Sequence, residues 1–326
     1  YQPRDIGALA TGEWVEVVVA VTEYSLRPLA SKPGKFLSLT LQDRTGIVPA
    51  VMWEGFEAQI GNFGDTPILH AWGQVQDYRG KPQLKLDRIE VIAPDKVNAS
   101  WFLPSLPDAR IEALWARLVE LITSVSEPNL SALLTGWLIE DEAFARRFKE
   151  GPGARRMHHA YLGGLLEHTV TVCEMAEGVI TAHPEFDRDL LLTGVIIHDL
   201  GKLVEYKWDI AIGTTDEGEL IGHTVIGHQM LLERLAGLED FPWQLSLRLQ
   251  HLILSHHGER DYGAPILPKT PEALAVHYLE NLDAKANQFE TLRQKAAETG
   301  AEWSEYEPAL ERRIWAPLPD EEPEIE

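Results

Sequence analysis

The stretch Ile197-His198-Asp199-Leu200-Gly201-Lys202 places a histidine and an aspartate side by side at the end of an apolar run. The run Leu190–Ile197 predicts a helix, with Asp187 as its N-cap and Gly201 as the residue that ends it. His198 and Asp199 then lie at the helix end that carries partial negative charge, which suits a neighbouring cation. Imidazole and carboxylate groups together bind zinc, manganese or iron, and the two oxygens of Asp199 can bridge two ions.

The same arrangement recurs further along the chain. Trp243–His257 has an apolar stripe at helical spacing that ends in Ser255-His256-His257, followed by Gly258. His168 lies beside another such stripe, and eleven of the 12 histidines fall between His158 and His277. This concentration at predicted helix ends indicates a metal site in a helical region.

The composition is that of a globular protein of two or three domains: 326 residues, 44% hydrophobic and 25% charged, with one cysteine, Cys173. A single cysteine excludes a disulfide scaffold and a cysteine-based zinc cluster. No apolar run has the length of a membrane span, and residues 1–10 do not resemble a secretion signal. We therefore expect a cytoplasmic protein.

The net charge of −22 is unevenly distributed along the chain. Residues 1–96 carry a net charge of −2, residues 97–297 carry −12, and residues 298–326 carry −8. This distribution excludes a simple basic groove for nucleic acid, but it does not exclude phosphate chemistry at a metal site.

Short alternating runs separated by turns fill the first part of the chain, and their spacing predicts a small closed barrel. Five strands are expected, at residues 13–19, 36–41, 47–53, 68–75 and 83–89. The stretch from Gly34 to Trp53 resembles the OB-folds related to tRNA anticodon-binding domains. Such barrels hold single strands by stacking bases on aromatic rings beside basic side chains. The candidate contacts are Phe36, Trp53, Trp72, Tyr78, Lys32, Lys35, Arg79 and Lys81.

The histidine pattern resembles a known signature as well. His168…His198-Asp199…Asp283 is similar to the H…HD…D signature of the HD phosphohydrolase superfamily, an all-helical, metal-dependent fold. The surrounding motifs resemble those of the YhaM-type 3′→5′ exoribonucleases, in which an OB-fold precedes the HD domain. These motifs are Gly163–Thr169, Ile197–Lys202, Gly222-His223, Leu254–Gly258 and Asn281–Lys285.

The resemblance implies a multidomain chain with an N-terminal all-β OB-fold barrel and an all-α HD domain after it. We expect the OB-fold nucleic-acid-binding domain at residues 1–95 and a linker with a connecting helix at 96–130. The HD domain follows at 131–300, and 301–326 forms an acidic, partly disordered tail.

The resemblance also implies a dinuclear metal centre. His168, His198, Asp199 and Asp283 would hold one ion, and Asp199 with His223, His256 and His257 the second. Some relatives hold a third ion with an acidic residue at the position of Gly164, so no third ion is expected. Mn²⁺ is the expected metal, while Fe²⁺, Co²⁺, Mg²⁺ and Zn²⁺ remain open. Two such ions can clamp a phosphodiester for in-line displacement.

Other candidate residues surround the expected ligands. Lys202 is placed to hold a phosphate oxygen, and His158 or His159 to protonate the leaving 3′-oxygen. Arg155 and Arg156 lie in a concentrated basic segment and are candidate phosphate contacts. The remaining histidines are assigned to packing or to the surface: His70, His183, His228, His251 and His277.

The predicted function is a metal-dependent 3′→5′ exonuclease that degrades single-stranded RNA, with DNA left open, to nucleoside 5′-monophosphates. One alternative is a nucleotide or cyclic-dinucleotide phosphodiesterase, because His256–Pro265 partly resembles the HHExxxGxGYP run of cyclic-dinucleotide hydrolases. The run departs from it at Gly258 and at Gly263-Ala264. A second alternative is a non-catalytic single-strand-binding protein. Whether the chain forms a homo-oligomer is left open.

Overall fold

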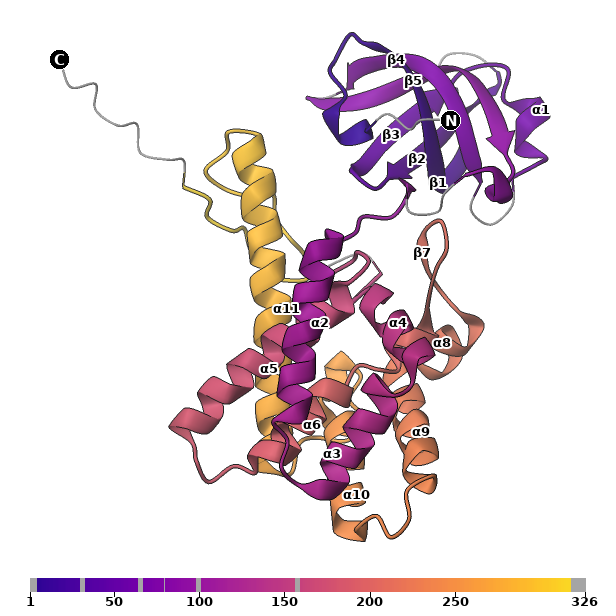
Figure 1. Ribbon diagram of the computed structural model, residues 1–326. Coiled ribbons are helices and arrows are strands. Elements are labelled where there is room, and N and C mark those ends of the chain that lie inside the picture. The colour runs from indigo at the N-terminus through magenta and orange to yellow at the C-terminus, as the bar shows by residue number, and fades with distance from the viewer. Residues whose placement is uncertain are drawn as a thin grey trace, which may run out of the picture. The chain divides into compact units, whose positions relative to one another are not determined.

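The computed structural model describes residues 5–29, 33–63, 67–78, 80–97, 101–155 and 159–317 (Figure 1). Contacts divide the chain into two compact units, Tyr1–Pro107 with Tyr206–Thr215, and Asp108–Glu205 with Asp216–Glu326. The first unit is a β-barrel and the second is helical, so the predicted fold class is confirmed.

The barrel closes in the strand order β1-β2-β3-β5-β4. Its strands are β1 (Trp14–Pro28), β2 (Lys35–Asp43), β3 (Gly46–Met52), β4 (Ile68–Tyr78) and β5 (Lys81–Ile92), with the short helix α1 (Glu57–Ile60) after β3. The first half of β1 pairs with β4 and its second half with β2, with a register shift between Val21 and Glu23. The long strand β1 therefore pairs with two neighbouring strands, and this pairing closes the sheet into a barrel.

The interior of the barrel is filled by side chains from alternating positions of the strands. Val15, Val17 and Val19 of β1 point inward against Leu37 and Leu39 of β2, and all five are at most 3% exposed. Burying one such aliphatic side chain contributes about 1.5–3 kcal/mol, so the alternating pattern is the main source of stability in this unit. The strand periodicity in the sequence is thus explained by the core.

A hairpin from the second half of the chain belongs to the barrel unit. Its strands are β6 (Tyr206–Trp208) and β7 (Ile212–Thr214). Ile210, between them, packs against a separate apolar cluster of the barrel unit, whose members are Val18, Ala20, Ile68, Ile92 and Phe102. The five strands predicted from the sequence do not include this hairpin.

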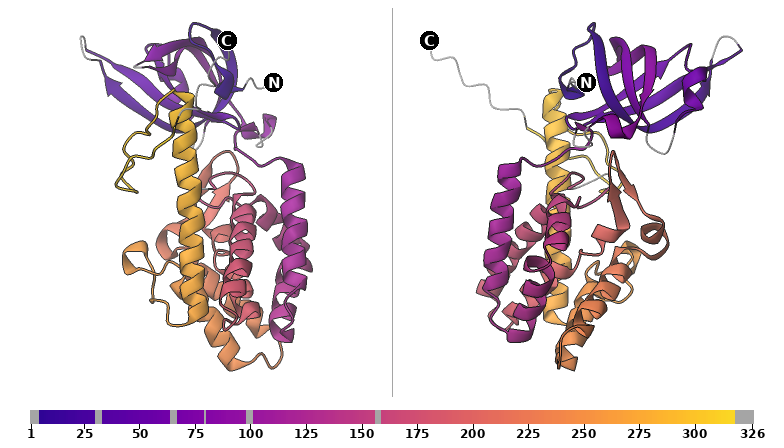
Figure 2. Two further views of the ribbon diagram at one scale, coloured as in Figure 1. Left: turned by 90° about the vertical axis from the view of Figure 1, so that its left-hand side faces the viewer. Right: turned by 45° about the vertical axis from the view of Figure 1, so that its right-hand side comes forward.

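The helical unit is built around α5, which contacts α2, α4, α6 and α11. The helices before residue 206 are α2 (Asp108–Thr123), α3 (Pro128–Leu134), α4 (Glu142–Glu150), α5 (Gly164–Ala182), α6 (Arg188–Ile197) and α7 (Lys202–Glu205), with a π-helical turn at Thr135–Ile139. The later helices are α8 (Asp216–Ile221), α9 (His223–Ala236), α10 (Trp243–Ser255) and α11 (Pro271–Glu298). The 28-residue α11 runs along the unit (Figure 2).

The start of α6 is as predicted, but its end is not. The Asp187 side chain accepts a hydrogen bond from the Leu190 N–H, as an N-cap does. Gly201 does not end the helix, because α6 stops at Ile197 and Gly201 has no positive φ. A Cβ on Gly201 would instead lie 2.0 Å from the His223 carbonyl oxygen, so close backbone packing requires glycine here.

The segment after α11 is folded as far as the structure describes it. Trp303 pairs with Trp315 and Glu307 with Arg312 in isolated bridges, while Leu310 and Ile314 are buried. Residues 318–326 of the expected tail lie outside the described residues. None of the described helices is both long and apolar enough to cross a membrane.

Candidate metal centre

The seven residues expected to bind metal come from five helices or their ends. They are His168 on α5, His198 and Asp199 at the end of α6, His223 at the start of α9, His256 and His257 after α10, and Asp283 on α11. The structure brings all seven together, and His198 and His256 are completely buried. Groups this polar are buried only where they have partners, so their gathering needs an explanation.

Each histidine in the cluster has an oxygen acceptor behind the ring, at its Nδ1 atom. His198 donates to the Val195 carbonyl at 2.6 Å and His256 to the Ile253 carbonyl at 2.7 Å, the same three-residue step at the ends of α6 and α10. His257 donates to the Tyr262 carbonyl at 2.7 Å and His168 to the Asp283 carboxylate at 2.6 Å. His223 Nδ1 lies 2.7 Å from the Glu205 carboxylate, at ion-pair distance. In a neutral ring, the Nε2 atom then carries a lone pair for a metal.

The five Nε2 atoms form two groups around Asp199. Its Oδ2 lies 3.4 Å from His198 Nε2 and 3.7 Å from His168 Nε2. Its Oδ1 lies 3.6 Å from His223 Nε2 and 3.7 Å from His256 Nε2. His257 joins the second group, with its Nε2 3.1 Å from that of His223. One carboxylate oxygen therefore faces each group.

The cluster has the features of a cation site. The Nε2 atoms of His223 and His257 lie 3.1 Å apart, and two ring nitrogens approach this closely only with a proton or a cation between them. Asp199 Oδ1 and His256 Nε2 are buried without a hydrogen-bond partner among the described residues. An unsatisfied buried polar group costs about 1–3 kcal/mol, and a shared cation would satisfy both. The donor set therefore fits divalent metal ions.

Burial keeps most of the rings neutral. It lowers the pKa of His168 and of His257 to about 4, and burial together with the neighbouring His257 lowers the pKa of His256 well below its usual value. His198 is the exception, since the adjacent Asp199 carboxylate outweighs burial and raises its pKa. Burial opposes ionisation of Asp199 too, but Lys202 and His198 hold its pKa well below the usual range. Neutral imidazoles and an ionised carboxylate are the forms that bind metal.

Asp283 lies behind the first group and connects it to His159. Its Oδ2 accepts hydrogen bonds from His168 Nδ1 at 2.6 Å and from His159 Nε2 at 2.9 Å. The other ring nitrogen of His159 contacts the Tyr161 hydroxyl at 2.9 Å, and that hydroxyl donates to Glu167 at 2.6 Å. The two ring nitrogens of His159 thus contact Tyr161 and Asp283, and the ring is 4% exposed.

The main chain around His159 is fixed by two glycines. His159 has a left-handed φ of 55°, and its carbonyl accepts from the Gly153 N–H at 2.9 Å. A Cβ on Gly164 would lie 2.1 Å from that carbonyl oxygen. Glycine at position 164 is therefore needed to bring His159 against Asp283.

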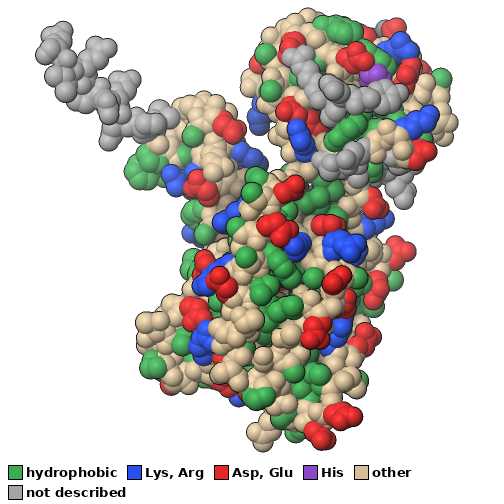
Figure 3. All heavy atoms as spheres, viewed as in Figure 1, with side chains coloured by type: hydrophobic (Ala, Val, Ile, Leu, Met, Phe, Trp, Pro, Cys, Tyr) green, Lys and Arg blue, Asp and Glu red, His purple; other side chains and the backbone are tan. Residues whose placement is uncertain are grey.

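The remaining predicted catalytic and basic residues are spread more widely. Lys202 is buried and donates to Asp199 Oδ2 at 2.6 Å, so its ammonium belongs to the centre. Arg155 is exposed, whereas Arg156 and His158 lie outside the described residues. Acidic and basic side chains are intermixed over the helical unit on the face in Figure 3.

The predicted nucleic-acid contacts form two aromatic pairs on the barrel. Phe36 and Trp53 have ring centroids 4.7 Å apart, and Trp53 is 44% exposed. Trp72 lies 3.9 Å from the His70 ring, with the Arg88 guanidinium 4.7 Å from its centroid. The predicted residues Lys35, Tyr78 and Lys81 are exposed, while Lys32 and Arg79 lie outside the described residues.

The histidines assigned to packing or to the surface have other partners. His228 contacts Gln250, His251 accepts from the Lys269 N–H, and His277 contacts the His256 carbonyl. His70 contacts Glu16 and His183 contacts Glu185. Tyr161 and Glu205 also contact residues of the cluster, and the sequence does not predict them because neither belongs to a motif. Their only signal in the sequence is their position near Glu167 and Lys202, which do belong to motifs.

Family comparisons cover both units. Residues 165–285 match the HD domain family, and residues 14–92 match an OB-fold nucleic acid binding domain family. Among solved structures, a replication factor A related protein from Methanobacterium thermoautotrophicum is 20% identical, covering 29% of this chain and 94% of its own, with a TM-score of 0.25.

Curated relatives match nearly the whole chain. A 3′-5′ exoribonuclease YhaM from Geobacillus sp. is 33% identical over 93% of this chain and 91% of its own. The Bacillus subtilis protein of the same name is 33% identical over 93% and 94% of the two chains. That of Listeria welshimeri is 34% identical over 86% and 88%.

Proposed function

The chain belongs to the family of YhaM 3′→5′ exoribonucleases, and from this membership and the metal centre we propose how it acts. It is a metal-dependent 3′→5′ exoribonuclease whose hydrolytic site is the histidine and aspartate cluster of the helical unit. The observation that carries this proposal is the position of Asp199, with one oxygen facing each of two Nε2 groups.

The two groups would hold one divalent ion each. His168, His198 and Asp199 Oδ2 are the proposed ligands of the first, and Asp199 Oδ1, His223, His256 and His257 those of the second. Asp283 stays a proposed ligand of the first ion because it matches the family signature, while its Oδ2 accepts from His168 Nδ1 and His159 Nε2. Bound divalent ions supply Lewis-acid activation of water and stabilise charge on the phosphate.

Three further residues act on this centre. The Lys202 ammonium, 2.6 Å from Asp199 Oδ2, adds a positive charge where phosphate oxygens gather, and we propose that it contacts a non-bridging oxygen. His159 holds Asp283 in place, and Tyr161 in turn fixes the orientation of the His159 ring. We therefore assign His159 and Tyr161 as positioning residues instead of proton donors.

The barrel is proposed to bind the single-stranded substrate. Its exposed Trp53 packs against Phe36, and Lys35 and Lys81 are exposed cations of a unit that is almost neutral overall. Aromatic rings beside basic side chains hold single strands without reading their sequence. RNA is the proposed substrate because the relatives are named for it, and activity on single-stranded DNA is also proposed.

The products, the activating metal and the cellular location are further parts of the proposal. We propose nucleoside 5′-monophosphates as products, Mn²⁺ as the activating metal and the cytoplasm as the location. The imidazole-rich donor set supports a first-row transition metal, although it does not select one of them.

The direction of degradation tests the proposed function. A single-stranded RNA labelled at its 5′ end should give a ladder of progressively shorter labelled products with Mn²⁺, and the same RNA labelled at its 3′ end should release labelled mononucleotide at once. Turnover of a cyclic dinucleotide with no shortening of RNA would favour the phosphodiesterase alternative. Binding of RNA without cleavage would favour the alternative of a non-catalytic single-strand-binding protein.

A further inference from the structure

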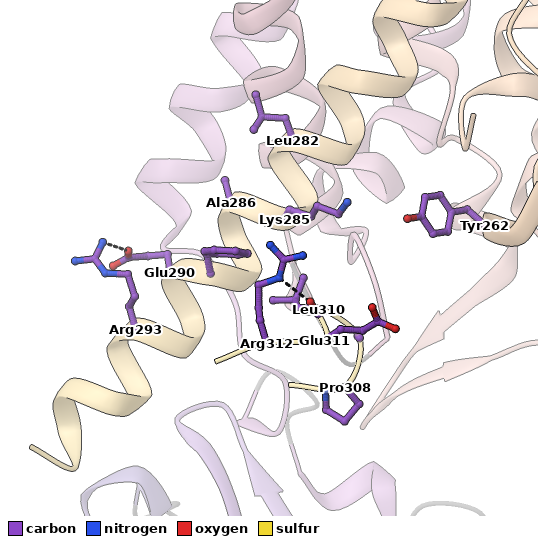
Figure 4. Close-up of a pocket in the computed structure, with 12 residues that line it drawn as sticks. Tyr262, Leu282, Lys285, Ala286, Glu290, Arg293, Pro308, Leu310, Glu311 and Arg312 are labelled. Atoms are coloured by element: carbon purple, nitrogen blue, oxygen red, sulfur yellow. Dashed lines mark hydrogen bonds and ion pairs between the residues drawn. The ribbon is translucent and has the colours of Figure 1, made fainter. Parts of the chain in front are cut away.

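A pocket of about 810 Å³ lies between the second half of α11 and the folded segment after it (Figure 4). We propose that this pocket binds the nucleotides that lie upstream of the scissile phosphate of single-stranded RNA. The inference rests on the proposed exoribonuclease function and names a substrate site that the metal centre and the barrel do not include.

The pocket shares two segments of chain with the metal centre. Leu282 and Lys285, which line it, lie on either side of Asp283 along α11. Tyr262 lines it from the loop after α10, and the carbonyl of the same residue accepts the Nδ1 proton of His257 at 2.7 Å. The pocket and the centre are therefore neighbours, joined by α11 and by the loop after α10.

The pocket is longer than one nucleotide. Its lining on α11 runs from Leu282 to Arg293, and this interval spans roughly 16 Å at a rise of about 1.5 Å per residue. Stacked nucleotides repeat at roughly 3.4 Å, so several bases fit along this length. An extended polymer matches this shape better than a free mononucleotide does.

The lining side chains match the chemistry of a single strand. Tyr262 and Phe289 present aromatic rings for bases, and the Tyr262 side chain is 56% exposed. Lys285, Arg293 and Arg312 bring three cations to a lining that also holds Glu290 and Glu311, and Arg293 is paired with Glu290 at 3.0 Å. In Figure 4, Lys285 and Arg312 extend toward the space that Tyr262 faces. Aromatic rings interleaved with cations are the usual features of a single-strand site.

The outer wall of the pocket is held in place before any ligand binds. Buried Leu310 and Ile314 anchor the segment, and the Ser304 hydroxyl accepts from the Ile314 N–H at 2.8 Å. The Arg312 Nε–H donates to the Leu310 carbonyl at 2.7 Å, which fixes the guanidinium at the pocket. An ordered wall reduces the entropy lost on binding.

The first test compares a diribonucleotide with a hexaribonucleotide in the full-length protein with Mn²⁺. Tyr262→Leu should lower the ratio of kcat/KM for the longer to the shorter RNA by roughly five- to a hundredfold, as expected from loss of one base stack. Lys285→Gln should reduce the slope of log affinity against log salt concentration by about 0.7, because one phosphate contact is lost. Lys295→Gln, an exposed change on α11 outside the pocket, should keep the wild-type ratio and slope.

Crosslinking gives a second measurement that needs no variant. Hexaribonucleotides carrying 4-thiouridine should crosslink to peptides containing Tyr262, Phe289 or Arg312, identified by mass spectrometry. Wild-type protein that shortens RNA, with pocket variants indistinguishable from Lys295→Gln or crosslinks only elsewhere, overturns the pocket and leaves the proposed function intact. Wild-type protein that fails to shorten RNA overturns the proposed function itself, and the pocket with it.

Discussion

Asp199 is the residue at which the two groups of histidines meet, since each of its oxygens lies 3.4–3.7 Å from imidazole Nε2 atoms of a different group. Asp199→Asn keeps the size of the side chain but removes the charge that both ions would share. Turnover of RNA should therefore fall by at least about a thousandfold, which corresponds to about 4 kcal/mol of transition-state stabilisation. RNA hydrolysis and bound metal, by mass spectrometry, are the measurements.

His228→Asn is the matched control for this change, because His228 lies on α9 with His223 but contacts Gln250 instead of the centre. It should keep the metal content and most of the activity. An Asp199→Asn protein that retained two ions and near-normal hydrolysis would remove Asp199 from the bridging position.

Tyr161 tests the supporting residues of the first group. Tyr161→Phe deletes the hydroxyl that fixes His159, and His159 in turn holds Asp283. Loss of such a supporting contact typically weakens metal binding by about 10–100-fold, so more Mn²⁺ should be needed for half-maximal hydrolysis of RNA. Tyr278→Phe, at an exposed position of α11, should leave this requirement as in the wild type. An unchanged Mn²⁺ titration in Tyr161→Phe would show that the hydroxyl does not support the centre.

The residues of the metal centre differ in how clearly the sequence predicts their positions. His198-Asp199 and His256-His257 stand out because they end apolar helices, and a helix end is a local feature. His159 reaches Asp283, 124 positions away, only because its backbone adopts a left-handed turn. Such a contact depends on loop geometry, and a sequence pattern therefore suggested a different role for His159.

At the scale of elements, α6 and α10 present their histidines in the same way, with Nδ1 donating to a carbonyl of the last turn. The sequence predicted these ends, and Asp187 is the N-cap of α6 as expected. Glycine at position 201, after α6, is required for a reason other than ending the helix. Gly201 is required by close contact with the backbone of His223 and Gly227, and contacts between distant segments have no local signal.

Gly201→Ala should separate α6 from α9 and so disturb the centre that they share. The added Cβ would lie 2.0 Å from the His223 carbonyl and 2.7 Å from the Gly227 nitrogen, both backbone atoms. Overpacking of this kind costs about 1–3 kcal/mol of unfolding free energy, which urea denaturation measures. Gly178→Ala on α5, where no atom lies within 4 Å, should instead be neutral or stabilise by up to about 1 kcal/mol. Equal stabilities of the two variants would contradict the packing described for Gly201.

At the scale of the whole molecule, the barrel and the helical unit are expected to contribute differently to RNA degradation. Trp53→Ala removes an exposed ring of the Phe36–Trp53 pair and should raise the KM for a long single-stranded RNA by roughly five- to a hundredfold. Trp14→Ala, at a 59% exposed position of the same barrel that is not a predicted contact, is the control and should leave that KM unchanged. Equal effects of the two changes would argue against this pair as a substrate site.

The two folds were predictable because each repeats a simple period, two in the strands and about 3.6 in the helices. Segments without such a period were not predicted. Residues 206–215 form a hairpin of two three-residue strands that joins the barrel unit through Ile210. The segment from Ala301 to Pro317 lies in the predicted acidic tail, yet Leu310, Ile314 and Ala316 are buried within it. Its four glutamates and two arginines give a net charge of only −2, and most of the negative charge of residues 298–326 comes after Pro317.

Metal dependence is the most direct test of the claim that the histidine and aspartate cluster performs the hydrolysis. Protein stripped with EDTA and freed of the chelator should leave 5′-labelled single-stranded RNA intact, and addition of Mn²⁺ should restore the ladder of products shortened from the 3′ end. The close approach of the His223 and His257 Nε2 atoms and the unpartnered Asp199 Oδ1 motivate this expectation. Full activity in protein shown by mass spectrometry to be free of metal would contradict it.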